Sequence, residues 1–339
     1  MFNKLKDRVV VVTGASSGIG RATALRLAEK KAYVVAGARR RGALESLAQQ
    51  CHQRGTAAIP VVTDVTDEEA VERLAGKALE HFGHIDAWIN NAAVGLFARF
   101  EEAPPEAFRR VLETNLFGYV HGARAALRYF RDQGYGTLIN VSSMLGQGGA
   151  PYESAYVTSK FGINGLSMCL RQELKGTDIN VSVVMPASVD TPLFQQAANY
   201  TGRVVKPIDP VFDPDKVAKT IVKLVKRPRD MVYVGNAGRM MGALRKVSPR
   251  VYESAMVRQV EKDHFQDEAA PPRSGNLFEP QEQWGRVDGG WANGRGLLKN
   301  GAAKVAVAGL LMALPAMAYA MWPSKTARTV SKVRALLPG

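Results

Sequence analysis

The sequence predicts an α/β protein built on a doubly wound, mostly parallel sheet of about seven strands, with helices on both faces. Two observations support this fold class. Short runs of β-branched residues alternate with longer amphipathic patterns between residues 8 and 235, and a glycine-rich turn directly follows the first run. Strands separated by helices pair in parallel, because each crossover must lay a helix on a face of the sheet.

Seven runs rich in Val, Ile and Ala are the predicted strands. In chain order they are RVVVVTG at 8–14, AYVVAGA at 32–38, AAIPVVTDV at 57–65, DAWINNAA at 86–93, GTLINVSS at 136–143, INVSVVMP at 179–186 and MVYVG at 231–235. The predicted helices cover 19–31, a segment ending at 49, 68–82, a segment starting at 105, 115–131, the region of Tyr156, and 215–226. Another helix is expected over 239–262, with Leu244, Val247, Val251 and Val257 near one face.

The organisation of the chain changes after this helix. Residues 1–262 are predicted to form the α/β domain, and 263–296, rich in Pro and Gly, a linker or a segment wrapped on the surface. Residues 297–339 are predicted to form a basic, apolar C-terminal helix. Its uncharged stretch, 305–322, would extend roughly 27 Å, against about 30 Å for a bilayer core. Basic flanks with Tyr319 and Trp322 favour a membrane anchor, and an amphipathic or core-packed helix is the alternative.

The net charge of +14 does not favour nucleic-acid binding, because half of it lies in this tail. Residues 295–339 contain seven basic and no acidic side chains, a pattern that favours anionic lipid, and no nucleic-acid motif accompanies it. Cys51 and Cys169 match no disulfide or metal spacing, so we expect a reducing compartment and no metal site. The expected location is cytoplasmic, or membrane-associated facing the cytoplasm through the C-terminal helix.

The turn TGASSGIG, residues 13–20, is the predicted phosphate site. Its three glycines permit positive φ and close backbone approach, and the following helix offers free N–H groups at its positive end. The position of the turn between a strand and a helix makes it typical of dinucleotide binding. The candidate cofactor contacts in the turn are Thr13, Gly14, Ser16, Ser17, Gly18, Ile19 and Gly20.

The glycine spacing, together with the motifs below, resembles the short-chain dehydrogenase/reductase family over about residues 6–235. The resemblance implies a Rossmann-like fold and an oxidoreductase activity. It implies further cofactor contacts from Asn91 and Ala92 in NNAA at 90–93, which departs from the family's Asn-Asn-Ala-Gly at Ala93. It also implies contacts from Asp64 and Val65 near the adenine, and from Pro186, Val189 and Thr191 near the carboxamide, where Ala187 replaces a glycine.

The end of the second strand, AGARRR, indicates the coenzyme. An NAD-dependent enzyme places a carboxylate there for the ribose hydroxyls, whereas a 2′-phosphate requires arginine. Ala38 stands where the Asp would be, and Arg39 and Arg40 follow, so we expect NADP(H). A solvated basic helix start is the alternative interpretation of these arginines.

Tyr156 and Lys160 lie four positions apart on a predicted helix, which places them on one face about one turn apart. A neighbouring ammonium favours the phenolate, so we expect Lys160 to lower the pKa of Tyr156 toward the range of a general acid/base. The family resemblance implies that Lys160 also binds the nicotinamide ribose, that Ser143 orients the substrate carbonyl, and that Asn115 positions a water behind Lys160. Asn115, Ser143, Tyr156 and Lys160 are the candidate catalytic residues.

These features predict an NADP(H)-dependent oxidoreductase that reduces a ketone or aldehyde, or oxidises the alcohol. Apolar residues after Pro186, namely Leu193, Phe194, Tyr200 and Phe212, suggest a lid over a lipophilic substrate. The alternative from another class is a sensor or scaffold protein that binds NADP(H) without turnover. The glycine spacing disfavours an extended-family sugar epimerase. The resemblance also implies a homodimer or homotetramer packed through the helices of Asn115 and Tyr156.

Overall fold

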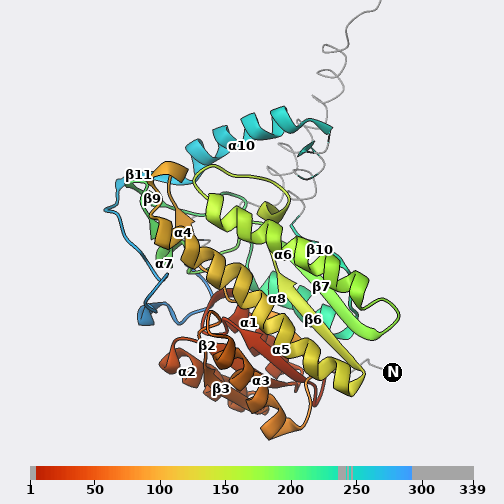
Figure 1. The fold of residues 1–339 in the computed structure, drawn as a ribbon. Helices are drawn as coiled ribbons and strands as arrows, with labels where there is room; N and C mark the ends of the chain where they lie inside the picture. The colour runs from red at the N-terminus through yellow and green to blue at the C-terminus, as the bar shows by residue number, and fades with distance from the viewer. Residues whose placement is uncertain (1–4, 236–241, 243, 246, 292–339) are drawn as a thin grey trace, which may run out of the picture. The chain divides into compact units, whose positions relative to one another are not determined.

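The computed structural model describes residues 5–235, 242, 244, 245 and 247–291. Its centre is a seven-stranded sheet in the order β10-β7-β6-β4-β1-β2-β3, in which every neighbouring pair is parallel (Figure 1). The strands are β1 Val9–Thr13, β2 Tyr33–Ala38, β3 Ala58–Val62, β4 Ala87–Asn90, β6 Tyr135–Val141, β7 Asp178–Pro186 and β10 Met231–Val234. The prediction of a doubly wound parallel sheet of seven strands is confirmed.

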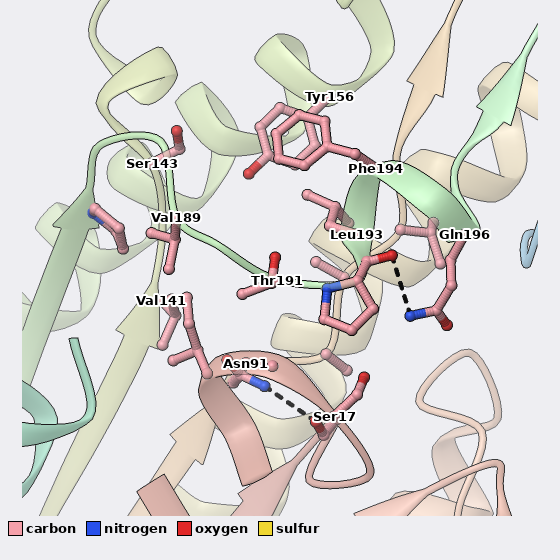
Figure 2. A pocket seen from close by; sticks show the side chains of 18 of the residues that line it. Ser17, Asn91, Val141, Ser143, Tyr156, Val189, Thr191, Leu193, Phe194 and Gln196 are labelled. Carbon is pink, nitrogen blue, oxygen red and sulfur yellow. Dashed lines mark hydrogen bonds between the residues drawn. The ribbon is translucent and has the colours of Figure 1, made fainter. Parts of the chain in front are cut away.

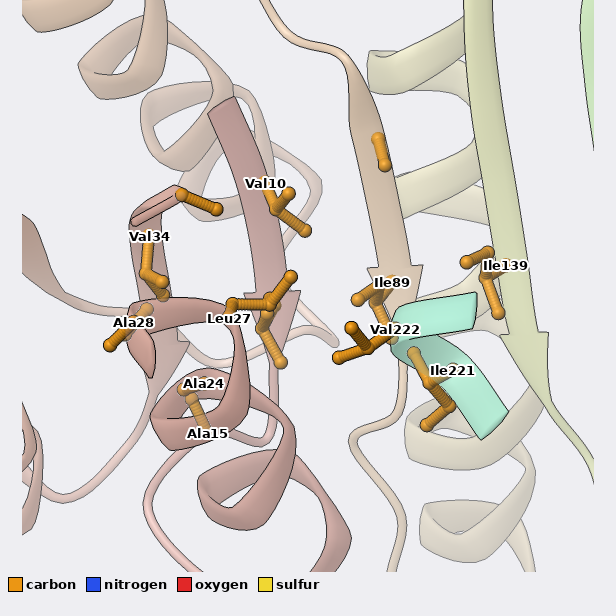
Figure 3. Close-up of a cluster of buried hydrophobic side chains, with 14 of the residues drawn as sticks. Val10, Ala15, Ala24, Leu27, Ala28, Val34, Ile89, Ile139, Ile221 and Val222 are labelled. Carbon is orange, nitrogen blue, oxygen red and sulfur yellow. The ribbon is translucent and has the colours of Figure 1, made fainter. Parts of the chain in front are cut away.

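Helices cover both faces of this sheet. They are α1 Gly18–Glu29, α2 Arg41–Gln53, α3 Glu68–Phe82, α4 Pro105–Leu112, α5 Gly118–Gln133, α6 Ser154–Glu173 and α8 Pro214–Lys226. Successive side chains of a strand point to opposite faces. Val10 therefore packs in the core under α1, α2 and α8, where Leu27 and Ile221 also lie (Figure 3), while Val11 packs in the core under α3, α5 and α6. The continuous valine run of β1 is explained by burial on both sides.

Shorter elements lie beyond the carboxyl ends of the strands. β5 Leu96–Phe97 pairs with β8 Ala198–Asn199, and β9 Arg203–Val205 pairs with β11 Phe265–Ala269. The four-residue helix α7, Leu193–Gln196, precedes β8. None of these short pairings was predicted, because strands of two or three residues carry too little periodicity to detect and β11, FQDEA, is mostly polar.

The final described α-helix is α10, Pro249–Asp263, and the prediction of its apolar face is wrong. Its buried residues are Tyr252, Met256 and Val260, whereas Val251 and Val257 are exposed. The buried three lie at i, i+4 and i+8 and pack against Phe97 and Phe265, so a tertiary surface rather than the valine pattern selects the face. Val247, before the helix, is also exposed.

After β11, residues 271–291 run along the carboxyl edge of the sheet; we call this segment the strap. Its Leu277 is fully buried beside Val94 and Val111. The proposed boundaries at 262 and 296 stay predictions, and the predicted C-terminal helix, 297–339, lies outside the described residues. Within the described part of the chain, no helix combines the length and the apolar character needed to cross a membrane.

Candidate active site

A cavity of about 350 Å³ lies at the carboxyl ends of β1, β2, β4, β6 and β7. Figure 2 shows Ser17 and Asn91 at one end of it and Ser143 and Tyr156 at the other. The predicted cofactor and catalytic residues that line it are Gly14, Ser16, Ser17, Gly18, Ile19, Arg39, Arg40, Asp64, Val65, Asn91, Ala92, Ser143, Tyr156, Lys160, Pro186, Val189 and Thr191. Thr13, Gly20 and Asn115 were predicted as well but do not line it.

The glycine turn is shaped for close approach of a ligand backbone. Gly14 has a φ of +66°, and a Cβ there would lie 2.7 Å from the Cα of Ala92. A Cβ on Gly20 would lie 2.3 Å from the carbonyl oxygen of Gly14. The first turn of α1 begins at Gly18 and leaves N–H groups without intrahelical acceptors at the cavity wall. This cradle fits a pyrophosphate.

Hydrogen bonds between Thr13 and Asn91 stabilise the glycine turn. The amide of Asn91 donates to the Thr13 carbonyl at 3.0 Å, and the Thr13 hydroxyl accepts the backbone N–H of Asn91 at 3.0 Å. Thr13 is buried, so its role within this structure is to hold the two strand ends together. Gly20 likewise acts through packing, because a side chain there would displace the turn.

The strap covers the arginines predicted to choose the coenzyme. Arg39 donates to the carbonyls of Asn276, Leu277 and Phe278, the first at 2.5 Å. Arg40 donates to the Gln281 carbonyl at 2.9 Å and to the hydroxyls of Ser16 and Ser17. Burial lowers the pKa of both guanidinium groups from the usual value. These acceptors were missed from the sequence, since any residue can offer a backbone carbonyl.

The strap also reaches the phosphate turn. The N–H of Gly18 donates to the carbonyl of Arg286 at 3.0 Å. Asp190 accepts the N–H groups of Gly289 and Trp291 at 2.9 and 3.0 Å. The strap therefore contacts the phosphate turn, and its residues Asn276, Pro280 and Gln281 line the cavity.

Asp64 is paired within the protein. Burial opposes its charged form, but hydrogen bonds from Thr66 and the Arg110 guanidinium at 2.7 Å together lower the pKa of the carboxyl. Arg110 also donates to the Leu277 carbonyl at 3.0 Å, so this ion pair connects the strap to the side of the cavity that Asp64 lines.

Ser143, Tyr156 and Lys160 meet at the other end of the cavity. Ser143 follows β6, and its side chain and that of Tyr156, on the first turn of α6, line the same end of the cavity (Figure 2). Lys160, one turn further, donates to the Val141 carbonyl at 3.0 Å, and its Nζ lies 5.3 Å from the centre of the Tyr156 ring. The hydroxyl of neighbouring Ser142 instead donates to the Lys160 carbonyl at 3.3 Å.

Asn115 lies behind this group, fully buried in the π-helical turn Glu113–Phe117 that joins α4 to α5. Its side chain accepts the N–H of Val94 at 2.8 Å and donates to the Val94 carbonyl at 2.9 Å. A π-helical turn inside a helix often marks a functional position. Here it places the Asn115 amide against the segment that follows β4, and the implied water relay stays a prediction.

The pKa of Tyr156 differs from the expectation that Lys160 would lower it. Burial, aided by the charge of Glu153, raises the pKa of Tyr156, and the hydrogen bond from Ser143 opposes this rise. Burial also lowers the pKa of Lys160 to about 7. In the protein alone, the ammonium therefore does not acidify the phenol, because Lys160 gives up much of its own charge near neutral pH.

The substrate end of the cavity is largely apolar. Leu193 and Phe194 line it, as predicted for the lid, together with Ile208 and Met256, whereas Tyr200 and Phe212 do not. Two polar residues there, Glu153 and His264, were missed. Their positions are 111 apart in the sequence, and no motif joins them.

The fold and the site define a nicotinamide-dependent oxidoreductase of the α/β class. The sequence profile of the short chain dehydrogenase family matches residues 8–201, more than half of the chain, and this protein belongs to that family.

Named relatives have similar sequences. An uncharacterized oxidoreductase of Bacillus subtilis, YxnA, is 36% identical over 276 residues, which cover 80% of this chain and 78% of the relative. The cis-4-hydroxycyclohexanecarboxylate dehydrogenase of Sinomonas cyclohexanicum is 37% identical over 66% of this chain and 91% of its own length. The 3-oxoacyl-(acyl-carrier-protein) reductase FabG of Thermotoga maritima is 31% identical over 65% of this chain and 91% of its own.

Two solved structures share the fold. A short chain dehydrogenase/reductase from Burkholderia phymatum in complex with NAD matches with a TM-score of 0.67 and 24% identity, over 75% of this chain and 97% of that one. An alcohol dehydrogenase from the archaeon Thermococcus sibiricus, complexed with 5-hydroxy-NADP, matches with a TM-score of 0.60 and 29% identity, over 68% and 96%. The chain is thus a dehydrogenase/reductase acting on CH–OH groups, and a nicotinamide cofactor and a small-molecule substrate are typical of its family.

Proposed function

We propose that this protein reduces a lipophilic ketone or aldehyde with NADPH, and oxidises the alcohol in reverse, using Tyr156, Lys160, Ser143 and Asn115. One observation carries the proposal. The half-buried hydroxyl-bearing side chains of Ser143 and Tyr156 line the same cavity as the glycine turn that fits a pyrophosphate. A cavity with these two ends holds a dinucleotide and a carbonyl compound together.

The residues divide the reaction between them. When bound in this cavity, a reduced nicotinamide would be the source of the hydride that the carbonyl carbon accepts. The Tyr156 hydroxyl donates its proton to the carbonyl oxygen, so the C=O group becomes CH–OH and no charge is left on the substrate. Ser143 donates a hydrogen bond to the same oxygen and stabilises the negative charge that develops there.

Lys160 is suited to return the proton to Tyr156. A pKa of about 7 lets its amine exist in both protonation states near neutral pH. Asn115 holds the segment that follows β4, which forms the wall behind Lys160. The family resemblance adds a water at this point, and Asn115 and that water would connect Lys160 to solvent.

The NADP(H) preference is supported by side-chain chemistry. Ala38 offers no carboxylate to the ribose, and Arg39 and Arg40 both line the cavity at this end. A 2′-phosphate would replace the strap carbonyls as the acceptor of Arg39, and a charged acceptor binds a guanidinium more strongly than a carbonyl. The relative from Thermococcus sibiricus was solved with an NADP derivative.

The substrate class is supported by the apolar lining and by one relative. The dehydrogenase from Sinomonas cyclohexanicum acts, by its name, on a hydroxylated cyclohexane ring. We propose a cyclic or other bulky lipophilic ketone for this chain.

We also propose that the chain forms a homodimer or homotetramer and that its C-terminal segment attaches to a membrane. Phe117, Phe161 and Met168 are exposed on or next to α5 and α6, the helices proposed to pack in a homodimer or homotetramer. Light scattering of the purified chain checks the assembly, and fractionation of cells expressing the chain with and without 297–339 checks membrane attachment.

The activity is tested by oxidation of NADPH, compared with NADH, against a panel of cyclic and linear ketones, with products identified by mass spectrometry. Turnover of at least one bulky ketone with NADPH preferred is the expected result. Tight NADPH binding with no turnover across the panel would instead favour the sensor or scaffold protein.

A further inference from the structure

Glu153 is an acidic side chain buried in the substrate end of the cavity. It is 8% exposed, lines the cavity, and precedes α6 by one residue, three positions before Tyr156. Its carboxylate makes no hydrogen bond with the part of the chain that the structure describes; it lies 3.4 Å from the His264 ring, and its charge acts on Tyr156. Burying a carboxylate with so few partners costs free energy of folding, so its presence in the cavity calls for a functional explanation.

The ring of His264 lies against this carboxylate. Its Nδ1 lies 2.5 Å from the Lys206 carbonyl, which can only accept, so Nδ1 carries a proton there. Its Nε2 faces Glu153, is buried, and forms no hydrogen bond within the described residues. Edge contacts with Phe97 and Phe194 fix the ring plane. The Nε2 edge of the ring therefore lies 3.4 Å from one carboxylate oxygen of Glu153, and within the described residues neither carboxylate oxygen receives a hydrogen bond.

Several residues that line the cavity with Glu153 are apolar. Phe194, Ile208 and Met256 line the cavity with Glu153 and His264, and the polar Asp209 and Gln259 line it as well. A carboxylate accepts hydrogen bonds and donates none. The matching ligand group is a hydroxyl or another hydrogen-bond donor at a distance from the reacting carbonyl.

We propose that Glu153, oriented by His264, is a specificity-determining residue that binds a second hydroxyl group of the substrate. The proposal rests on the proposed reductase function, because it concerns the ligand of the same cavity. It adds that the substrate is a hydroxylated lipophilic ketone, held at its carbonyl by Ser143 and Tyr156 and at its hydroxyl by Glu153. His264 is the positioning residue.

The test compares probes that differ only at the distal group. The long set is 4-phenylcyclohexanone with its 4-hydroxyphenyl and 4-methoxyphenyl analogues, and the short set is cyclohexanone with its 4-hydroxy and 4-methoxy derivatives. The methoxy probes keep the oxygen and remove the donor. Dissociation constants from calorimetry with the NADP⁺-loaded protein are measured beside kcat/KM, so the preference is read even where turnover is slow.

The expected result is a preference of about tenfold or more for the hydroxy over the methoxy probe in at least one set, the range of a hydrogen bond to a charged group. Glu153→Leu removes the preference and Glu153→Gln keeps part of it, because the amide oxygen still accepts. His264→Phe keeps the ring in its aromatic contacts and lowers the preference. Glu261→Gln, a change of an exposed glutamate outside the cavity, leaves it unchanged.

Equal binding of hydroxy and methoxy probes in both sets overturns the proposal, as does an unchanged preference in Glu153→Leu. The outcome for the proposed function is separate. Turnover of the unsubstituted ketones with NADPH supports the reductase whether or not Glu153 selects a hydroxyl, and hydroxyl-selective binding without any turnover removes the reductase while keeping the subsite.

Discussion

The backbone N–H of Gly18 donates to the carbonyl oxygen of Arg286 at 3.0 Å, which ties the first turn of α1 to the strap. The same helix end is the anion site expected of the glycine turn. We therefore expect cofactor entry and strap position to be coupled through this one hydrogen-bond donor.

Loosening the strap should accelerate cofactor exchange. Asp190→Ala removes the acceptor of the Gly289 and Trp291 N–H groups, so the end of the strap loses two hydrogen bonds. Both the association and the dissociation rate of NADPH are expected to rise several-fold, because a segment that borders the groove must move in both directions. Stopped-flow fluorescence measures the rates. Asp288→Ala, an exposed change in the same segment, is the control, and unchanged rates in Asp190→Ala would contradict the coupling.

Coenzyme choice should depend on Arg39. Arg39→Ala is expected to reduce the ratio of kcat/KM for NADPH over NADH about tenfold or more, because a charge-assisted contact with the 2′-phosphate is lost. The ratio is the informative quantity, since loss of the strap contacts of Arg39 affects both coenzymes alike. Arg41→Ala, at the exposed start of α2, should leave the ratio unchanged. An undiminished ratio in Arg39→Ala would remove the basis for NADP(H).

Removal of the Tyr156 hydroxyl should greatly slow the reaction. Tyr156→Phe is expected to lower kcat by about 10²-fold or more, the usual contribution of a positioned general acid. NADPH binding, followed by fluorescence, should persist because the ring remains. Tyr152→Phe is the matched control, since that hydroxyl bonds Glu261 outside the cavity. Retained turnover in Tyr156→Phe would refute the proposed mechanism.

The buried Lys160 should leave a signature in stability against pH. Its folded-state pKa of about 7 lies below the unfolded value of about 10.4, so between these values the unfolded chain binds the extra proton. The free energy of unfolding should therefore rise with pH in this window, by up to about 1.4 kcal/mol per pH unit. Lys160→Met lacks the group and should lose this rise. Urea unfolding of both proteins at pH 7, 8 and 9 measures it, and parallel curves would show that Lys160 keeps an ordinary pKa.

The strap should depend on one buried side chain. Leu277→Ala is expected to destabilise the protein by about 2–5 kcal/mol, because it leaves a cavity beside Val94 and Val111. Phe278→Ala, at the exposed neighbour, should cost far less. Thermal unfolding compares the two variants. Equal losses would mean that the strap is not held by its leucine.

The local pattern of the sequence was enough for the sheet and for most of the site. The valine run of β1, the glycine turn and the four-residue spacing of Tyr156 and Lys160 act over short stretches of chain, where side-chain period and backbone freedom decide the structure. These signals predicted seven parallel strands and most of the residues that line the cavity.

Only the tertiary structure decided what depends on distant partners. The carbonyls that meet Arg39 have no sequence signature, because every residue carries one, and Glu153 faces His264 through folding alone. The buried face of α10 follows the surface on which it packs rather than its valines. The pKa of Tyr156 was misjudged for the same reason, since burial is a property of the whole fold and outweighs a neighbour four positions away.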